Sequence, residues 1–333
     1  MKNSICSFLA IIGTVIGSGF VSGKEIVVFF SRFGYFSFPC IILSFFILFF
    51  LFKFILNNGE KALKKLKNSK ISFFLNIFLC LIFSSAMFAG IGNILTFENK
   101  FFNYFLFFFV LILCLFVFKK GIGGLNKLNL VFVPVMTVVF LLAVVFSFKV
   151  KPIEVENSFG GLSFFYCLLY CVMNTANGGV MIAEFSSKLS QKQKTRVAFF
   201  SALVLSALLM LANIVLLQNP NSFESAMPIL SLFVGGGKIV MSVMVFIGCL
   251  TTLLTLTYTL SSSIRGLCKS EILNLFVSMM LPLLFSLFGF DFIVEYLYPL
   301  ASIFGVYILY DLFFHSVFKN GVKRFKKKEI KKI

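Results

Sequence analysis

The sequence predicts an all-α polytopic membrane protein with about ten transmembrane helices, a five-plus-five inverted repeat and broken helices 1 and 6. Of the 333 residues, 59% are hydrophobic and 13% charged, and the mean hydropathy is +1.02. Soluble domains have about 45–50% apolar and about 25% charged residues, so a water-soluble enzyme is excluded. Long apolar runs, and two Gly- and Asn-rich tracts five runs apart, complete the case.

The apolar runs are separated by polar or charged breaks and supply the predicted spans. A transmembrane helix needs about 20 predominantly apolar residues, and most of the runs reach that length. The predicted spans are residues 5–31, 35–56, 71–96, 101–118, 128–148, 161–185, 196–217, 237–263, 272–290 and 292–315.

The domain organisation follows from these spans. We expect a single transmembrane transporter domain over 1–318, with repeat one at about 1–150 and repeat two at about 160–315. The connecting segments, of which 149–160 is the longest external one, are too short for a soluble domain. A basic cytoplasmic tail at 319–333 completes the chain.

The positive charges predict the topology. The net charge is +18, and alternating spans place 23 of the 30 Lys and Arg residues in the expected cytoplasmic segments and five outside. This imbalance follows the positive-inside rule with both termini in the cytoplasm, so we expect an integral protein of the plasma (inner) membrane. Its partner is then the lipid bilayer, and no nucleic acid is expected.

Cysteine and histidine usage predicts neither a metal site nor an enzyme. Eight Cys lie in or beside apolar runs, where Cys usually packs as a small apolar side chain. Cys167 and Cys171 share a helix face, but no second Cys or His pair completes a metal site. The single His315 and the lack of a nucleophile–base pair argue against catalysis. No cofactor is expected, apart from Na⁺ as a possible coupling ion.

Span 1 is interrupted by small residues near its middle. Gly13, Gly17, Gly19 and Gly23 fall within eleven residues, and each Gly costs a helix interior about 1 kcal/mol relative to Ala. Close helix packing of the GxxxG type is one explanation. Local unwinding is the other, and it is favoured because the ionisable pair Lys24–Glu25 follows at once.

Span 6 carries a matching tract of poor helix formers, Asn174, Asn177, Gly178 and Gly179, followed by Glu184. The two tracts are five spans apart, and an odd offset inverts the topology of the second half, as in inverted-repeat transporters. Unwound backbone inside a bilayer is tolerated only beside protein, water or a ligand. Half-helix N-termini there attract anionic groups, and free carbonyls coordinate cations.

The motif Gly17-Ser18-Gly19-Phe20 with Ser22-Gly23-Lys24-Glu25 resembles the first span of the YkvI-like membrane transporters. That family belongs to the amino acid–polyamine–organocation superfamily, which has the leucine-transporter fold. The resemblance implies a secondary active transporter of a small, amino-acid-like solute, coupled to Na⁺ or H⁺ by alternating access. A transporter-like nutrient receptor or sensor subunit without net transport is the alternative.

The resemblance also implies where ligands bind. The carbonyls of Gly13 and Ile16 and the hydroxyls of Thr251 and Thr252 would hold a coupling cation. Back-bonding of the span 8 Thr hydroxyls to their own helix is the competing explanation. Substrate would contact residues of spans 1, 3 and 6, namely Gly17, Ser18, Gly19, Met87, Gly90, Asn93, Asn174, Thr175 and Asn177.

Glu25 is the strongest ionisable candidate, as proton carrier or gate. The alternative role is a structural ion pair with Lys24 or Arg32. Asp291 and Glu295, near the external start of span 10, are expected to pair with Arg32 as an outer gate.

Overall fold

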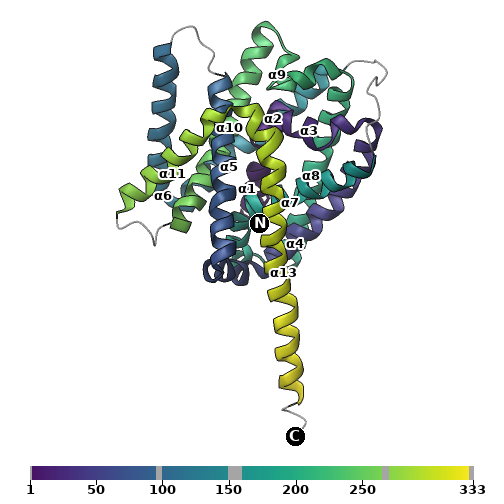
Figure 1. Ribbon diagram of the computed structural model, residues 1–333, viewed down its shortest axis with the longest axis vertical. Coiled ribbons are helices and arrows are strands. Elements are labelled where there is room, and N and C mark those ends of the chain that lie inside the picture. The colour runs from purple at the N-terminus through teal and green to yellow at the C-terminus, as the bar shows by residue number, and fades with distance from the viewer. Residues whose placement is uncertain (1, 95–99, 149–159, 265–269, 330–333) are drawn as a thin grey trace.

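The computed structural model of the chain describes residues 2–94, 100–148, 160–264 and 270–329. These residues are almost entirely helical, with short turns between helices (Figure 1). The α-helices are α1 Lys2–Val15, α2 Ser18–Ser22, α3 Lys24–Phe29, α4 Ser37–Asn68, α5 Lys70–Ile94, α6 Lys100–Ser147, α7 Gly160–Glu184, α8 Gln191–Leu217, α9 Pro228–Ser231, α10 Gly235–Ile264, α11 Glu271–Phe285, α12 Phe290–Phe292 and α13 Tyr298–Glu329.

The predicted fold class, an all-α polytopic membrane protein, is confirmed. Within the described residues, seven segments are long and apolar enough to cross a membrane, and two shorter apolar helices, Asn3–Val15 and Leu273–Phe288, accompany them. The seven segments are Ser31–Lys64, Lys70–Ile94, Lys127–Ser147, Gly160–Glu184, Gln191–Leu217, Gly235–Ile264 and Phe290–Phe313.

The predicted break in span 1 is present. Helix α1 ends at Val15, and Gly17 is extended, with φ −96° and ψ −166°. The short helix α2 then ends at Gly23, whose φ of +85° is a left-handed conformation that favours glycine. A Cβ on Gly23 would also lie 2.7 Å from Cγ1 of Ile229 in α9. The chain therefore crosses the core as three helical pieces.

The predicted break in span 6 is wrong. Helix α7 runs without interruption from Gly160 to Glu184. Thr175 donates its hydroxyl to the Cys171 carbonyl at 2.7 Å, and Asn174 donates to the Tyr170 carbonyl at 3.1 Å. These bonds, one turn back along the helix, satisfy the polar side chains without unwinding the backbone.

The separation expected between spans 101–118 and 128–148 is also wrong, because all residues from Lys100 to Ser147 form the single helix α6. Its 48 residues would span about 72 Å if straight, more than twice the bilayer core of about 30 Å. The glycines between residues 119 and 127 each destabilise a helix by about 1 kcal/mol relative to Ala, which does not by itself end a helix whose backbone hydrogen bonds are otherwise formed. The expected external loop at 149–160 lies almost wholly outside the described residues.

The predicted tail is helical over its described part, because α13 continues to Glu329. In Figure 1 the C-terminal half of α13 projects away from the bundle. The other long helices enclose the broken first span: α1 packs against α6, α7, α8 and α10, and α2 packs against α5 and α10. The break therefore lies in the centre of the molecule.

A seam of small side chains joins α4 to α7. Cys167 donates its thiol to the Cys40 carbonyl at 3.0 Å, and the Cys40 thiol lies 3.4 Å from the Ser163 hydroxyl. Further along the seam, a Cβ on Gly59 would overlap the Ala183 carbonyl oxygen. The expectation that these Cys are buried small side chains is confirmed, and the seam brings two long helices into close backbone contact.

Gly59→Ala is expected to lower the thermal stability of the protein, because the added methyl forces α4 away from α7 at a cost of about 1–3 kcal/mol. Gly92→Ala is the matched control, since a Cβ there meets nothing within 4 Å. Unfolding in detergent is followed with a thiol-reactive dye, which reports exposure of the buried cysteines. Equal melting temperatures for the two variants would contradict the seam.

Candidate functional site

The centre of the molecule is the break between α1 and α2, which α5 and α10 cover. Ser18 donates its hydroxyl to Met87 Sδ at 3.3 Å. A Cβ on Gly90 would lie 3.1 Å from both the Ser18 Cβ and the Cys249 Sγ. The structure thus brings Ser18, Met87 and Gly90 together as predicted, whereas Asn93 is exposed near the end of α5, away from this group.

Glu25 of α3 turns its carboxylate inward and is only 4% exposed. Its Oε1 accepts a hydrogen bond from Asn174 Nδ2 at 3.2 Å. Its Oε2 lies against the backbone of α2, because a Cβ on Gly19 would be 2.7 Å from that oxygen. The predicted residues Gly19, Glu25 and Asn174 therefore meet, and Asn174, at 2% exposed, ties the carboxylate to α7.

Two further residues of α7 face the end of α1. Asn177 donates its side-chain amide to the Thr14 carbonyl at 3.3 Å. A Cβ on Gly178 would lie 2.7 Å from the Thr14 hydroxyl oxygen. The polar tract of α7 therefore contacts both sides of the break through its side chains, although the helix itself is continuous.

The candidate cation ligands divide into two groups. Thr252 Oγ1 lies 3.4 Å from the Gly13 carbonyl, and a Cβ on Gly17 would be 3.1 Å from that hydroxyl. Thr251 instead donates to carbonyls one turn back in α10. Ile16 is fully buried at the break. Within the described residues, no group of three His, Cys, Asp or Glu side chains is placed to hold a metal ion.

Lys24 points away from Glu25 and is 5% exposed. Its Nζ lies 3.0 Å from Asp291 Oδ1, 3.9 Å from Glu295 Oε2 and 3.4 Å from the Phe223 carbonyl oxygen. The alternative of a Lys24–Glu25 ion pair is therefore wrong. Lys24 instead joins α3 to α12 and to the segment between α8 and α9. This link between distant parts of the chain was not predicted.

Arg32, the other proposed partner, stacks its guanidinium over the Tyr166 ring, 4.2 Å from the ring centre. The acidic pair expected to bind Arg32 as an outer gate contacts Lys24. This acidic pair is thus held by a lysine of α3.

Aromatic rings pack around α3, the helix that carries Glu25, and around the neighbouring α5, an arrangement that was not predicted. Tyr170 packs against Phe29 and Phe30 with ring centres 5.8 and 4.9 Å apart. Tyr298 packs edge-on against Phe83 at 5.0 Å. Tyr170 also lies one turn before Asn174, whose amide binds the Glu25 carboxylate. The position of Tyr170, one turn before Asn174, was the only sequence signal for this arrangement.

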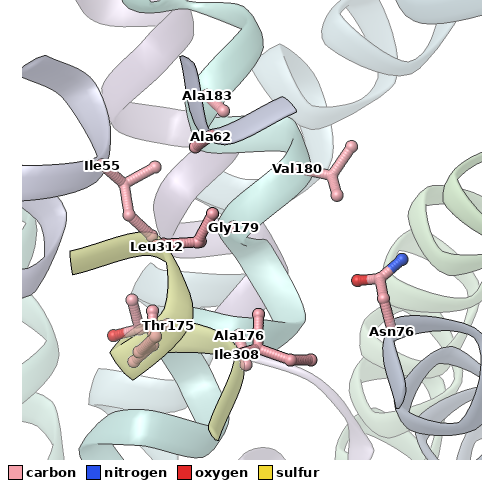
Figure 2. A pocket seen from close by; sticks show the side chains of 11 residues that line it. Ile55, Ala62, Asn76, Thr175, Ala176, Gly179, Val180, Ala183, Ile308 and Leu312 are labelled. Carbon is pink, nitrogen blue, oxygen red and sulfur yellow. The ribbon is translucent and has the colours of Figure 1, made fainter. Parts of the chain in front are cut away.

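A separate small cavity lies between α4, α5, α7 and α13 (Figure 2). Its volume is about 20 Å³, enough for about one water molecule. Thr175 lines it, with Asn76 on the opposite wall. The cavity is too small for an organic solute, and it places Thr175 on a different face of α7 from the Glu25 contact.

No family model matches the chain, and no curated protein matches it. Among solved structures, the chain is similar to Mhp1, a nucleobase-cation-symport-1 family transporter in a closed conformation with bromovinylhydantoin bound. The TM-score is 0.58 at 15% identity, covering 89% of this chain and 74% of Mhp1. The chain shares the fold of that transporter. The family resemblance seen at Gly17–Glu25 stays a prediction.

Asp291→Asn is expected to destabilise the protein more than Glu295→Gln, because Asp291 is the nearer partner of the buried Lys24 ammonium. Both carboxylates are about half exposed, so the loss for Asp291→Asn should be about 1 kcal/mol. Melting in detergent, compared at low and high salt, provides the measurement. A larger effect of Glu295→Gln would contradict the assignment of the main contact.

Proposed function

We propose that the chain is a secondary active transporter that moves a small, amino-acid-like solute by alternating access, coupled to Na⁺ or H⁺. The observation that carries the proposal is a helix interrupted in the centre of a membrane protein, with the buried carboxylate of Glu25 beside the interruption. Ionisable groups and non-helical backbone at this depth are costly and usually serve a ligand or an ion. The shared fold with a cation-symport transporter supports this class.

The proposed substrate site is the space around the break. Its wall consists of small residues of the first span, Met87 and Gly90 of α5, and the amide side chains of α7. A solute there would displace contacts that now close the site, among them the Asn174–Glu25 hydrogen bond. The proposed wall residues are Gly17, Ser18, Gly19, Met87, Gly90, Asn174 and Asn177.

The coupling cation, if it is Na⁺, is proposed to bind between α1 and α10. The Gly13 carbonyl and the Thr252 hydroxyl supply hard oxygen ligands there, and the Ile16 carbonyl lies at the same break. Thr251 is a weaker candidate, because its hydroxyl is already bonded within α10.

We also propose the ten-span, five-plus-five inverted repeat and cytoplasmic termini. The charge distribution supports this topology. With α7 continuous, the second half contributes to the site through side chains, whereas the first half contributes its broken backbone.

Transport is tested in proteoliposomes with a panel of radiolabelled amino acids and amines, under imposed Na⁺ or H⁺ gradients. Uptake that collapses when an ionophore removes one gradient would support the proposal and name the ion. Absence of both uptake and counterflow for every member of the panel would overturn it.

Thr252→Val is expected to remove Na⁺-stimulated uptake, because it deletes the hydroxyl nearest to the Gly13 carbonyl. Thr251→Val is the matched control, since that hydroxyl bonds only within its own helix. Initial uptake rates across a Na⁺ titration provide the measurement. Na⁺ stimulation that persists unchanged in Thr252→Val would count against a cation site between α1 and α10, and equal loss in both variants would add the Thr251 hydroxyl to its ligands.

A further inference from the structure

We propose that Glu25 is a single counter-charge for which a proton and the ammonium group of the substrate compete, so that the carrier exchanges an organic cation for H⁺. This inference rests on the proposed function and deepens it: it names the substrate class as ammonium-bearing solutes, and the coupling at Glu25 as exchange.

The first step is charge balance. Within the described residues, no Lys, Arg or His lies within 4 Å of the Glu25 carboxylate, and the adjacent Lys24 is held by Asp291. An isolated carboxylate in an apolar interior is strongly disfavoured unless it is paired or neutralised. The single hydrogen bond that the Asn174 side-chain amide donates does not supply a positive charge. Glu25 must therefore carry a proton when the site is closed and empty, and a cation when the site is closed and loaded.

The second step is the identity of the groups that face the carboxylate. Asn174 donates to it from α7, and Tyr170, one turn earlier on α7, packs its ring against Phe29 of the helix that carries Glu25. Gly19 faces it from α2. Of these, only Tyr170 is titratable, and it is not a cation. Neutralisation at this position thus has to come from a mobile species.

The third step is the chemistry of the surroundings, which suits an ammonium group better than a metal ion. Among the described residues, the fully buried Tyr170 hydroxyl has no hydrogen-bond partner, so this polar group can accept from the N–H of a bound ammonium. The Tyr170 ring, which packs against Phe29 of the helix that carries Glu25, adds a π-system of the kind that attracts organic cations. A bare metal ion needs several oxygen ligands, and rings and an amide N–H are not among them.

The exchange step balances without covalent chemistry. With the site open to one side, R–NH₃⁺ binds the carboxylate, and the carboxylic proton passes to water on that same side. One positive charge replaces another, so the closed site is neutral in both directions of the cycle. On the other side the ammonium leaves and a proton from water restores the acid.

The test uses dicyclohexylcarbodiimide, which modifies protonated carboxyls in apolar surroundings. The purified full chain is labelled in detergent with NaCl, choline chloride or butylammonium chloride at equal ionic strength. Modification at Glu25 is read by peptide mass spectrometry. The exposed Glu60 of α4 is the internal control. We expect Glu25 to react, and the organic cations, but not Na⁺, to slow the reaction several-fold without changing Glu60.

Two variants sharpen the result. Glu25→Gln should abolish labelling at position 25. Tyr170→Phe keeps the ring and should leave labelling intact while weakening protection by butylammonium about ten-fold, the loss expected for one hydrogen bond to a charged group. Protection by Na⁺ alone, or an unreactive Glu25, would overturn the inference.

The flux arm separates this inference from the proposed function. In proteoliposomes containing a trapped pH dye, inward movement of a cationic solute should make the interior more alkaline in wild type and not in Glu25→Gln. Solute uptake that persists unchanged in Glu25→Gln would overturn the exchange and leave the transporter assignment intact. Absence of flux for every solute would overturn the transporter assignment itself.

Discussion

The structure depends on one constraint: backbone polar groups inside a bilayer need partners, and the first span gives up part of its own helical bonding. Between Val15 and Ser18 the chain leaves helical geometry, in a region where water does not replace the missing bonds. Neighbouring helices compensate. Thr252 of α10 binds the Gly13 carbonyl, and Asn177 of α7 binds the Thr14 carbonyl. The two helices that pack against α1 therefore also supply hydrogen bonds to its free carbonyl groups.

The same constraint explains the placement of charge. The neighbours Lys24 and Glu25 reach different partners, because successive residues of a helix point about 100° apart. The lysine reaches a partly exposed acidic pair toward one end of the bundle, where its charge is balanced. The carboxylate remains in the centre with one amide donor. The balanced charge of Lys24 joins α3 to α12, and the carboxylate of Glu25 is the group to which we assign a ligand.

Much of the fold could be predicted from the sequence, because long apolar runs have only one stable form in a bilayer. The break in span 1 was predictable from its glycines, and the structure contains it. The break predicted in span 6 is absent, because helix propensity alone does not show which partners the polar side chains bond. Thr175 and Asn174 bond back along α7 and across to Glu25, and the helix survives. The Lys24–Asp291 contact and the packing of Tyr170 against Phe29 depend on how distant segments are placed in the fold, and residue spacing carries no information on that placement.

The seam between α4 and α7 has a consequence for how the molecule moves. Thiols, hydroxyls and glycine bring these two backbones so close that sliding one past the other would break many contacts at once. The two helices therefore form a rigid pair that joins the two halves of the chain. A rearrangement that exposes the centre to one side and then to the other would have to take place around this pair, with α1, α2 and α3 moving relative to it.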